Sequence, residues 1–210
     1  MIFRPSKMRV LRWLPDSLAL TRGPTRNQSI YLTFDDGPDP VHTPALLDLL
    51  KAHGALASFF LIGREAERHP QLVERIVAEG HCLGNHSYSH PLFNTLSLPE
   101  QLAEIDRTDQ LLERFDGVRR HRFRPPRGVF SLPLTLKFAS AGRNLAYWSY
   151  DSLDYQRRPA AELVDILRKA PPRAGDVLLM HDDSDCSTRM LATLLPEWKA
   201  GGYTFAALPA

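Results

Sequence analysis

Two adjacent aspartates and two later histidines are the residues in this chain best suited to chemistry. Asp35 and Asp36 end the apolar run from Ile30 to Phe34, and His86 and His90 stand four residues apart further along the chain. Neighbouring carboxylates resist joint ionisation, and a bound divalent cation relieves that conflict. Carboxylate oxygen and imidazole nitrogen suit Zn²⁺, Co²⁺, Ni²⁺ or Mn²⁺, so Asp36, His86 and His90 are predicted metal ligands.

Each half of this pattern also has a plainer explanation. The aspartates precede Gly37-Pro38 and could form an acidic turn, and a histidine pair at this spacing could be a surface or capping feature. A helical turn over residues 86 to 90 would put both imidazoles on the same side. Together the two halves favour a metal site with open positions for water and a substrate oxygen.

Four further side chains could complete hydrolytic chemistry around such a metal. Asp35 is the candidate base for a water proton, and His181, which follows a strongly apolar run, is the candidate acid. Asp154 is the carboxylate expected to keep His181 protonated. Arg124 is expected to orient Asp35, with a rim salt bridge as the alternative, and the backbone amide of Arg127 could face a developing oxyanion.

The segments that must position these residues alternate between short apolar runs and helical patterns. Strands are predicted at residues 30–34, 57–62, 81–83, 122–124, 145–149, 177–180 and 203–207. Helices are expected between them, one of them starting at a capping box formed by Ser97 and Glu100. Such alternation predicts parallel strands with helices outside. Because no glycine-rich phosphate loop follows the first strand, we expect a TIM-barrel-like α/β fold of seven βα units in a single domain.

The candidate residues all follow predicted strands. They are Asp35 and Asp36, His86 and His90, Arg124 and Arg127, Asp151 and Asp154, and His181 and Asp182. In a βα barrel the loops after the strands form one rim, where the chemistry takes place. The shared placement therefore predicts a single site.

Composition limits the partners of the protein. The formal charge of +2, without a long basic run, gives no reason to expect nucleic acid.

Residues 1–29 form a basic N-terminal segment that could contact a membrane surface or pack loosely as a solvated segment. Its charged residues are Arg4, Lys7, Arg9, Arg12, Arg22 and Arg26, opposed by Asp16. No stretch predicts a transmembrane helix or export signal, so we expect a cytoplasmic location, with membrane association as the alternative. The sequence does not predict the oligomeric state.

The two cysteines have neither the number nor the spacing of a disulfide framework or a thiolate metal site. Cys82 and Cys186 are therefore expected to be free thiols. Cys82 lies in a predicted strand, where we expect it to be buried as a small apolar residue.

With these residues, the chain resembles the polysaccharide deacetylase domain of carbohydrate esterase family 4, the chitooligosaccharide deacetylase homology domain. Its five motifs stand here as Thr33-Phe34-Asp35-Asp36-Gly37, His86-Ser87-Tyr88-Ser89-His90, Arg124-Pro125-Pro126-Arg127-Gly128, Asp151-Ser152-Leu153-Asp154-Tyr155 and Leu179-Met180-His181. The resemblance spans about residues 30 to 208, which we take as the catalytic domain.

The resemblance implies a distorted barrel with fewer than eight βα units and removal of an N-acetyl group from N-acetylglucosamine-type sugars in a glycan, oligosaccharide or glycolipid precursor. It implies Zn²⁺ as the first expectation for the metal. It also implies roles for single residues: Asp35 as base supported by Arg124, Asp36, His86 and His90 as ligands, His181 as acid oriented by Asp154, and Leu179 in the acetyl-methyl pocket.

Two departures from the family pattern bear on the substrate. Arg127 stands where the family usually has Tyr or Phe, and Tyr155 stands where it usually has Trp. Both make the cleft more polar, so we expect a substrate that carries a carboxylate or phosphate near the cleaved group. Alternatives are an O-acetyl esterase or a small cyclic-amide hydrolase on the same barrel, or a catalytically silent metal- or glycan-binding module. Retention of base, acid, ligands and Arg124 argues against the silent module.

Overall fold

A computed structural model describes residues 11, 13–129, 131–156 and 158–209 of the chain. Within them the strands are β1 (Ala19–Leu20), β2 (Ser29–Asp35), β3 (Ser58–Leu61), β4 (Cys82–Asn85), β5 (Leu145–Ala146), β6 (Tyr150–Asp151), β7 (Val177–His181) and β8 (Thr204–Ala206). The helices are α2 (Thr43–His53), α3 (Gly63–Arg68), α4 (Pro70–Ala78), α5 (Leu98–Asp116), α6 (Leu132–Ser140), α7 (Ala160–Lys169) and α8 (Cys186–Ala200). The basic residues Arg4, Lys7, Arg9 and Arg12 lie outside the described residues.

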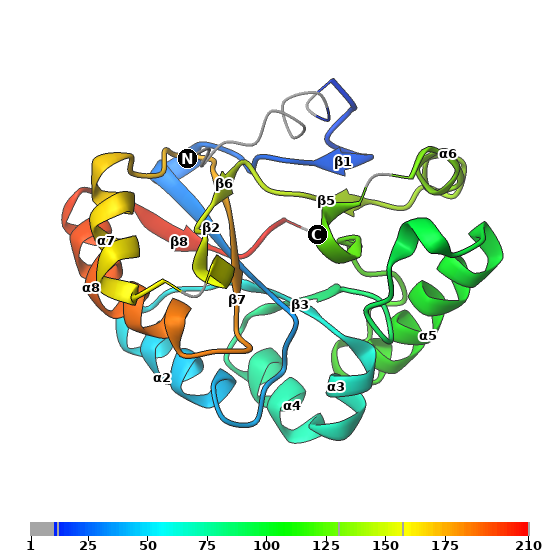
Figure 1. Ribbon diagram of the computed structural model, residues 1–210, viewed down its shortest axis with the longest axis horizontal. Helices are drawn as coiled ribbons and strands as arrows, with labels where there is room; N and C mark the ends of the chain where they lie inside the picture. Colours follow the sequence, from blue (N-terminus) through cyan, green and yellow to red (C-terminus); the bar gives the residue numbers. More distant parts are fainter. Residues whose placement is uncertain (1–10, 12, 130, 157, 210) are drawn as a thin grey trace.

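The strands pair in parallel around a ring. The order β4-β3-β2-β7-β6 forms the main path, and β8 pairs with the first half of β2. Single bridges join Asn85 to Phe123 and Phe123 to Leu145, and β5 leads along the same segment toward β6. The ring thus closes with β1 added outside β5, and the helices lie around it (Figure 1). The predicted α/β barrel is confirmed, and it is distorted because one of its members is a single bridged residue.

Successive side chains of a strand point to opposite faces of the sheet, and this alternation divides the core into two layers. In β2, Ile30, Leu32 and Phe34 belong to the cluster that packs with the helices, whereas Tyr31 belongs to the second cluster, which includes Phe60 of β3. Thr33 and Asp35 face the same side of β2 as Tyr31, because they lie two and four residues after it. The last residue of β2 therefore presents its carboxylate to the inside of the barrel.

Several predicted elements take a different form. The strand predicted at 122–124 is the single bridged residue Phe123. Of the one predicted at 145–149 only the first two residues form a strand, β5, and β6 begins just after its predicted end. Helix α3 and strand β1 were not predicted from the pattern. The capping box is confirmed, since the Ser97 amide donates to Glu100 Oε2 at 2.7 Å at the start of α5.

Cys82 does not act as a buried apolar residue. It is the exposed first residue of β4, whereas the three residues that follow it in the strand are buried. The expectation of burial is wrong because the amino end of this strand opens to the surface.

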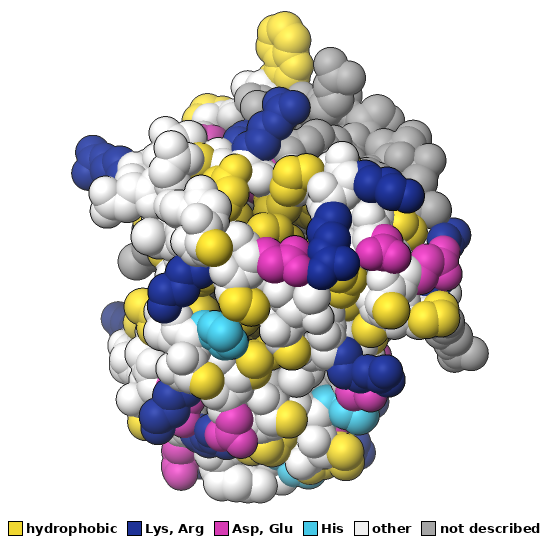
Figure 2. Space-filling model, turned by 90° about the vertical axis from the view of Figure 1, so that its left-hand side faces the viewer, with side chains coloured by type: hydrophobic (Ala, Val, Ile, Leu, Met, Phe, Trp, Pro, Cys, Tyr) yellow, Lys and Arg dark blue, Asp and Glu magenta, His cyan; other side chains and the backbone are white. Residues whose placement is uncertain are grey.

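Basic and acidic side chains are interspersed on the face of the molecule that Figure 2 shows. An ion pair also joins Arg168 of α7 to Glu197 of α8. Among the described residues, no helix combines the length and the apolar character needed to cross a membrane.

Candidate metal centre and active site

Asp35 lies buried at the carboxyl end of β2, directly in register with His181 at the end of β7. Its Oδ1 accepts a hydrogen bond from Arg124 Nη1 at 2.6 Å, and its Oδ2 lies 3.8 Å from His86 Nε2. Burial raises the pKa of Asp35, while the charges of Arg124 and His181 oppose that rise. A carboxylate held in one orientation with a raised pKa is suited to accept a proton.

Arg124 is fully buried, so it is no rim salt bridge. Besides Asp35, it donates to Thr33 Oγ1 at 2.8 Å and to the Tyr147 carbonyl at 3.1 Å. Its guanidinium lies 4.0 Å from the centroid of the Phe60 ring. These contacts fix the guanidinium, and through it the Asp35 carboxylate, as the sequence predicted.

Asp36, His86 and His90 come together from two loops. Their ligand atoms all lie within 4.8 Å of one another, and Asp36 Oδ1 is 3.5 Å from His86 Nε2 and 3.3 Å from His90 Nε2. The predicted helical turn is wrong, because residues 86 to 90 form a loop in which Ser87 and His90 have positive φ angles of 68° and 54°. The imidazoles still converge, with ring centroids 5.0 Å apart.

This donor set fits a divalent metal ion. Asp36 Oδ1 is buried and has no hydrogen-bond partner among the described residues. Ligand atoms around tetrahedral zinc stand about 3.3 Å apart, close to the separations of Asp36 Oδ1 from both imidazoles. The ring of His86 is fixed by a 2.8 Å hydrogen bond from Nδ1 to the Arg124 carbonyl, which leaves Nε2 as the ligand atom. Burial lowers the pKa of His86 to about 3, so its imidazole is neutral near pH 7.

His181 and Asp154 form a second charged pair on the same rim. His181 Nδ1 donates to Asp154 Oδ1 at 2.9 Å, and the other oxygen accepts from the His181 amide and from Ser187 Oγ, each at 2.6 Å. Although burial opposes it, Asp154 together with Asp35 and Asp36 raises the pKa of His181 to about 10. The imidazole is therefore protonated near neutral pH.

A cavity of about 210 Å³ joins these groups. It is lined by Asp35, Asp36, His86, His90, Arg127, Gly128, Trp148, Leu179 and His181. Arg127 is exposed and has a φ of 56°, whereas Leu179 and Trp148 are buried. Tyr155 stands beside the cavity, with its ring edge against His181 at a centroid distance of 5.7 Å.

Sequence reasoning missed two members of this site. Trp148 lines the cavity, and its place near the end of a predicted strand was a usable signal. Ser187 gave no such signal, because it reaches Asp154 only through the packing of α8.

Four predicted rim residues do not line the cavity: Arg124 and Asp154, which bind Asp35 and His181, and also Asp182 and Asp151. Asp182 is buried and accepts from Thr43 Oγ1 at 2.6 Å, and burial raises its pKa to about 7. Asp151 accepts from the Leu153 amide at 3.0 Å. Both carboxylates support loops of the site instead of facing its cavity.

The sequence is similar to known proteins over most of its length. Residues 22–146 match the family model described as polysaccharide deacetylase. The chain is 36% identical to a peptidoglycan-N-acetylglucosamine deacetylase of Bacillus cereus over 94% of this chain and 73% of the relative. It is 35% identical to a chitooligosaccharide deacetylase of Sinorhizobium fredii over 90% of this chain and 94% of the relative.

Two further matches extend the comparison. The peptidoglycan-N-acetylmuramic acid deacetylase PdaA of Bacillus subtilis is 32% identical over 87% of this chain and 71% of the relative. The crystal structure of the Bc1960 peptidoglycan N-acetylglucosamine deacetylase superposes with a TM-score of 0.87 at 32% identity, covering 95% of this chain and 94% of that one.

Proposed function

The chain belongs to the polysaccharide deacetylase family, and from that premise we propose that it is a metal-dependent hydrolase that removes an N-acetyl group from an amino sugar in a glycan. One observation carries the proposal. A buried Asp36 oxygen without a hydrogen-bond partner among the described residues stands beside two imidazoles, and the oriented carboxylate of Asp35 and the protonated imidazole of His181 line the same cavity. Base, ligand set and acid line one cavity.

Asp36, His86 and His90 would hold the metal, with Zn²⁺ the first choice and Co²⁺, Ni²⁺ or Mn²⁺ the alternatives. When bound, such an ion supplies Lewis acidity that makes water a better nucleophile and polarises an acyl oxygen. The neutral state of His86 and the fixed direction of its Nε2 favour ligation.

Asp35 takes the proton of the attacking water while the new bond between water oxygen and acetyl carbon forms. Arg124 keeps one carboxylate oxygen engaged at 2.6 Å, so the other oxygen is free to accept the proton. The backbone amide of Arg127 is proposed to donate to the oxyanion that develops on the acyl group.

His181 completes the reaction by giving its Nε2 proton to the sugar nitrogen as the carbon–nitrogen bond breaks. Its Nδ1 is bound to Asp154, so only Nε2 remains for the substrate. Acetate and a free amine are the products. The base thus gains a proton and the acid loses one, and solvent restores both groups.

The acetyl methyl group is proposed to rest on Leu179 and Trp148, the buried apolar side chains of the cavity. Arg127 is exposed at the same cavity and makes no ion pair with the described residues, which supports an acidic group on the substrate. The name of the Bacillus subtilis relative, an N-acetylmuramic acid deacetylase, points the same way.

Acetate release tests the proposed reaction. The protein is stripped of metal, reconstituted with zinc or cobalt, and assayed on neutral and acidic N-acetylated oligosaccharides and on an O-acetylated xylan. Metal-restored release from the amino sugars is expected. Release from xylan alone would favour an O-acetyl esterase, and stoichiometric metal binding without any release would favour the silent module.

The substrate preference has its own test in Arg127→Gln and Arg127→Tyr. Loss of the cation should reduce kcat/KM for acidic oligosaccharides about tenfold and leave neutral ones within about twofold. An unchanged ratio of acidic to neutral activity would remove Arg127 from substrate selection.

A further inference from the structure

A second cavity, of about 300 Å³, lies at the end of the barrel opposite the candidate site. Ser58 and Cys82, which line it, are the first residues of β3 and β4, whereas Asp35 and His181 are the last residues of β2 and β7. Leu208, near the end of the chain, closes another side and donates its amide to Ser58 Oγ at 2.9 Å. The cavity therefore shares no lining residue with the candidate active site.

One part of the cavity wall is apolar. Phe60 forms its inner surface, and Leu83, Val118, Leu208 and Pro209 also line it. A wall of this kind favours the hydrocarbon part of a ligand, because its burial removes apolar surface from water. The volume is at the lower end of the range for small-molecule sites, about 300–1,000 Å³.

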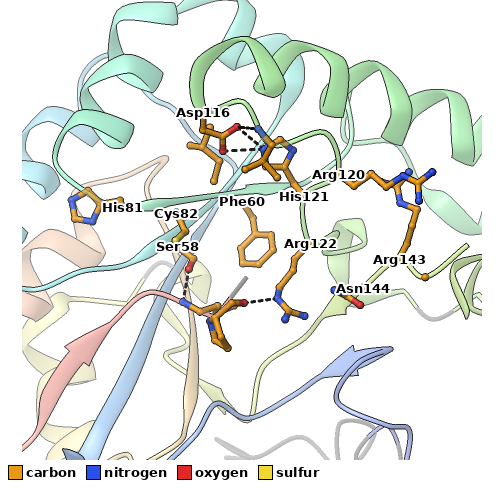
Figure 3. Close-up of a pocket in the computed structure, with 15 residues that line it drawn as sticks. Ser58, Phe60, His81, Cys82, Asp116, Arg120, His121, Arg122, Arg143 and Asn144 are labelled. Atoms are coloured by element: carbon orange, nitrogen blue, oxygen red, sulfur yellow. Dashed lines mark hydrogen bonds and ion pairs between the residues drawn. The ribbon is translucent and has the colours of Figure 1, made fainter. Parts of the chain in front are cut away.

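The other part of the wall is cationic. Figure 3 shows Arg120, Arg122 and Arg143 together on one side of the Phe60 ring, with Ser58 and Cys82 on the other side. The one carboxylate of the lining, Asp116, is engaged by His121 Nε2 at 3.1 Å. The lining thus carries more positive than negative charge.

Two of the arginines keep hydrogen-bonding capacity toward a ligand. Arg143 is nine-tenths buried; its terminal nitrogens bind Asp106 and Asp109, but its Nε has no hydrogen-bond partner among the described residues. Arg120 donates to the Ala141 carbonyl at 3.0 Å and forms no ion pair within the described part of the chain. A buried donor without an acceptor is costly, and a ligand oxygen would satisfy it.

We propose that this cavity binds a small amphipathic anion, a molecule with a short apolar body and a single carboxylate. The apolar body would rest on Phe60 and Leu208, and the carboxylate would accept hydrogen bonds on the arginine side. The ring of Phe60 also contacts the Arg124 guanidinium. A ligand bound in this cavity would therefore touch Phe60, which packs on Arg124, the residue that holds Asp35.

Calorimetric titration with hexanoate and hexanamide tests the chemistry of the site at fixed ionic strength. Hexanoate should bind with a dissociation constant of about 1 mM and the neutral amide at least about tenfold more weakly. Equal affinities for hexanoate and hexanamide would overturn the anionic part of the proposal. If hexanoate gave no binding heat up to about 20 mM, which is about 20 times the expected dissociation constant, the site itself would be overturned.

Two neighbouring arginines provide matched variants. Arg120→Gln should weaken hexanoate binding about fivefold, whereas Arg119→Gln removes the same charge from a residue that does not line the cavity and should leave binding unchanged. Both side chains are exposed, so both variants should fold. Equal effects of the two substitutions would attribute binding to net charge and contradict the proposed site.

The cysteines give an independent readout of position. Cys82 lines the cavity and Cys186 starts α8, far along the chain and outside the lining. Hexanoate should slow N-ethylmaleimide labelling of Cys82 at least about threefold and leave Cys186 unchanged, as measured by peptide mass spectrometry. Unchanged labelling of Cys82 under saturating hexanoate would place binding elsewhere and refute the assignment.

Discussion

The Asp35 and His181 side chains are neighbours in the strand register but have opposite electrostatic partners. Asp35 is bound by the Arg124 guanidinium, and His181 is bound by the Asp154 carboxylate. Each partner stabilises the charged form of the residue that it contacts. An ionised carboxylate and a protonated imidazole can therefore coexist near neutral pH, as a hydrolytic base and acid require.

Asp35→Asn separates the proposed base from the metal ligands. Turnover should fall by about 10²–10⁴-fold, because the amide cannot take a proton, while zinc content stays near one per chain. Acetate release and metal analysis of the same sample measure the two effects. Asp36→Asn is the comparison and should lose metal as well as turnover. Activity of Asp35→Asn within tenfold of the unaltered protein would exclude the proposed role.

Asp154→Asn tests the acid through the pH profile. His181 must be protonated to act, so activity should be lost as the pH rises through its raised pKa of about 10. Without the Asp154 charge that pKa falls, and the alkaline limb of kcat/KM should move down by about one to two pH units. Ser187→Ala, which removes one hydrogen bond to Asp154, should move the limb less. An unmoved limb in Asp154→Asn would assign the acid to another group.

The loop after β2 is the element that presents Asp36, the proposed ligand. Asp36 has a positive φ of 77°, and the next residue, Gly37, packs against the buried carboxylate of Asp182. Asp182 accepts from the Thr43 hydroxyl, which in turn accepts from the Asp39 amide at 2.8 Å. This chain of contacts ties the loop to α2 and to the segment after β7.

Gly37→Ala should disturb this loop. An added Cβ would meet Asp182 Oδ2 at 2.2 Å, so the loop or the buried carboxylate must shift. We expect a loss of about 2 kcal/mol in unfolding free energy and weaker zinc binding.

Gly54→Ala is a control with no heavy atom within 4 Å of its Cβ and a φ of 60°. It should cost about 1 kcal/mol of backbone strain and leave zinc binding unchanged. Denaturant unfolding and zinc titration distinguish the two, and equal zinc affinities would refute the role of the loop.

At the scale of the whole molecule, barrel closure brings distant segments to one rim. The proposed ligands follow β2 and β4, the proposed acid ends β7, and Arg124 follows the bridged residue Phe123. Part of the described N-terminal region belongs to this body, since Ala19 and Leu20 are buried and pair with β5. The domain boundary at residue 29, membrane contact through the basic segment and a cytoplasmic location stay predictions.

Because the proposed ligands come from separate loops that meet only in the folded chain, metal binding should stabilise that state. At a free zinc concentration 100 times the dissociation constant, the gain is about 2.7 kcal/mol, which raises the Tm by about 5–10 °C for a chain of this size. Thermal unfolding of stripped and reconstituted protein measures the shift. Asp36→Asn should lose most of it and Asp35→Asn should keep it. A full shift in Asp36→Asn would contradict the ligand assignment.

Local patterns in the sequence predicted the candidate residues and most of the strands and helices. The apolar runs predicted β2, β3, β7 and β8, and the capping box predicted the start of α5, because these signals are local in the chain. Asp36, His86 and His90 could be proposed as ligands because their side chains have the right donor atoms. The helical turn proposed for the histidines failed, since a spacing of four does not exclude a loop with positive φ angles.

Which side chains meet depends on the tertiary structure. The register of β2 with β7 puts Asp35 beside His181, and closure of the barrel brings Arg124 to Asp35 across 89 residues of sequence. Burial at the inside of the barrel then raises the pKa of Asp35 and lowers that of Arg124, whereas the carboxylates around His181 raise its pKa against the effect of burial. Ser187 joins the site only because the packing of α8 brings its hydroxyl to Asp154. Pairing register, burial and loop conformation depend on contacts between distant segments, and no local pattern in the sequence encodes them.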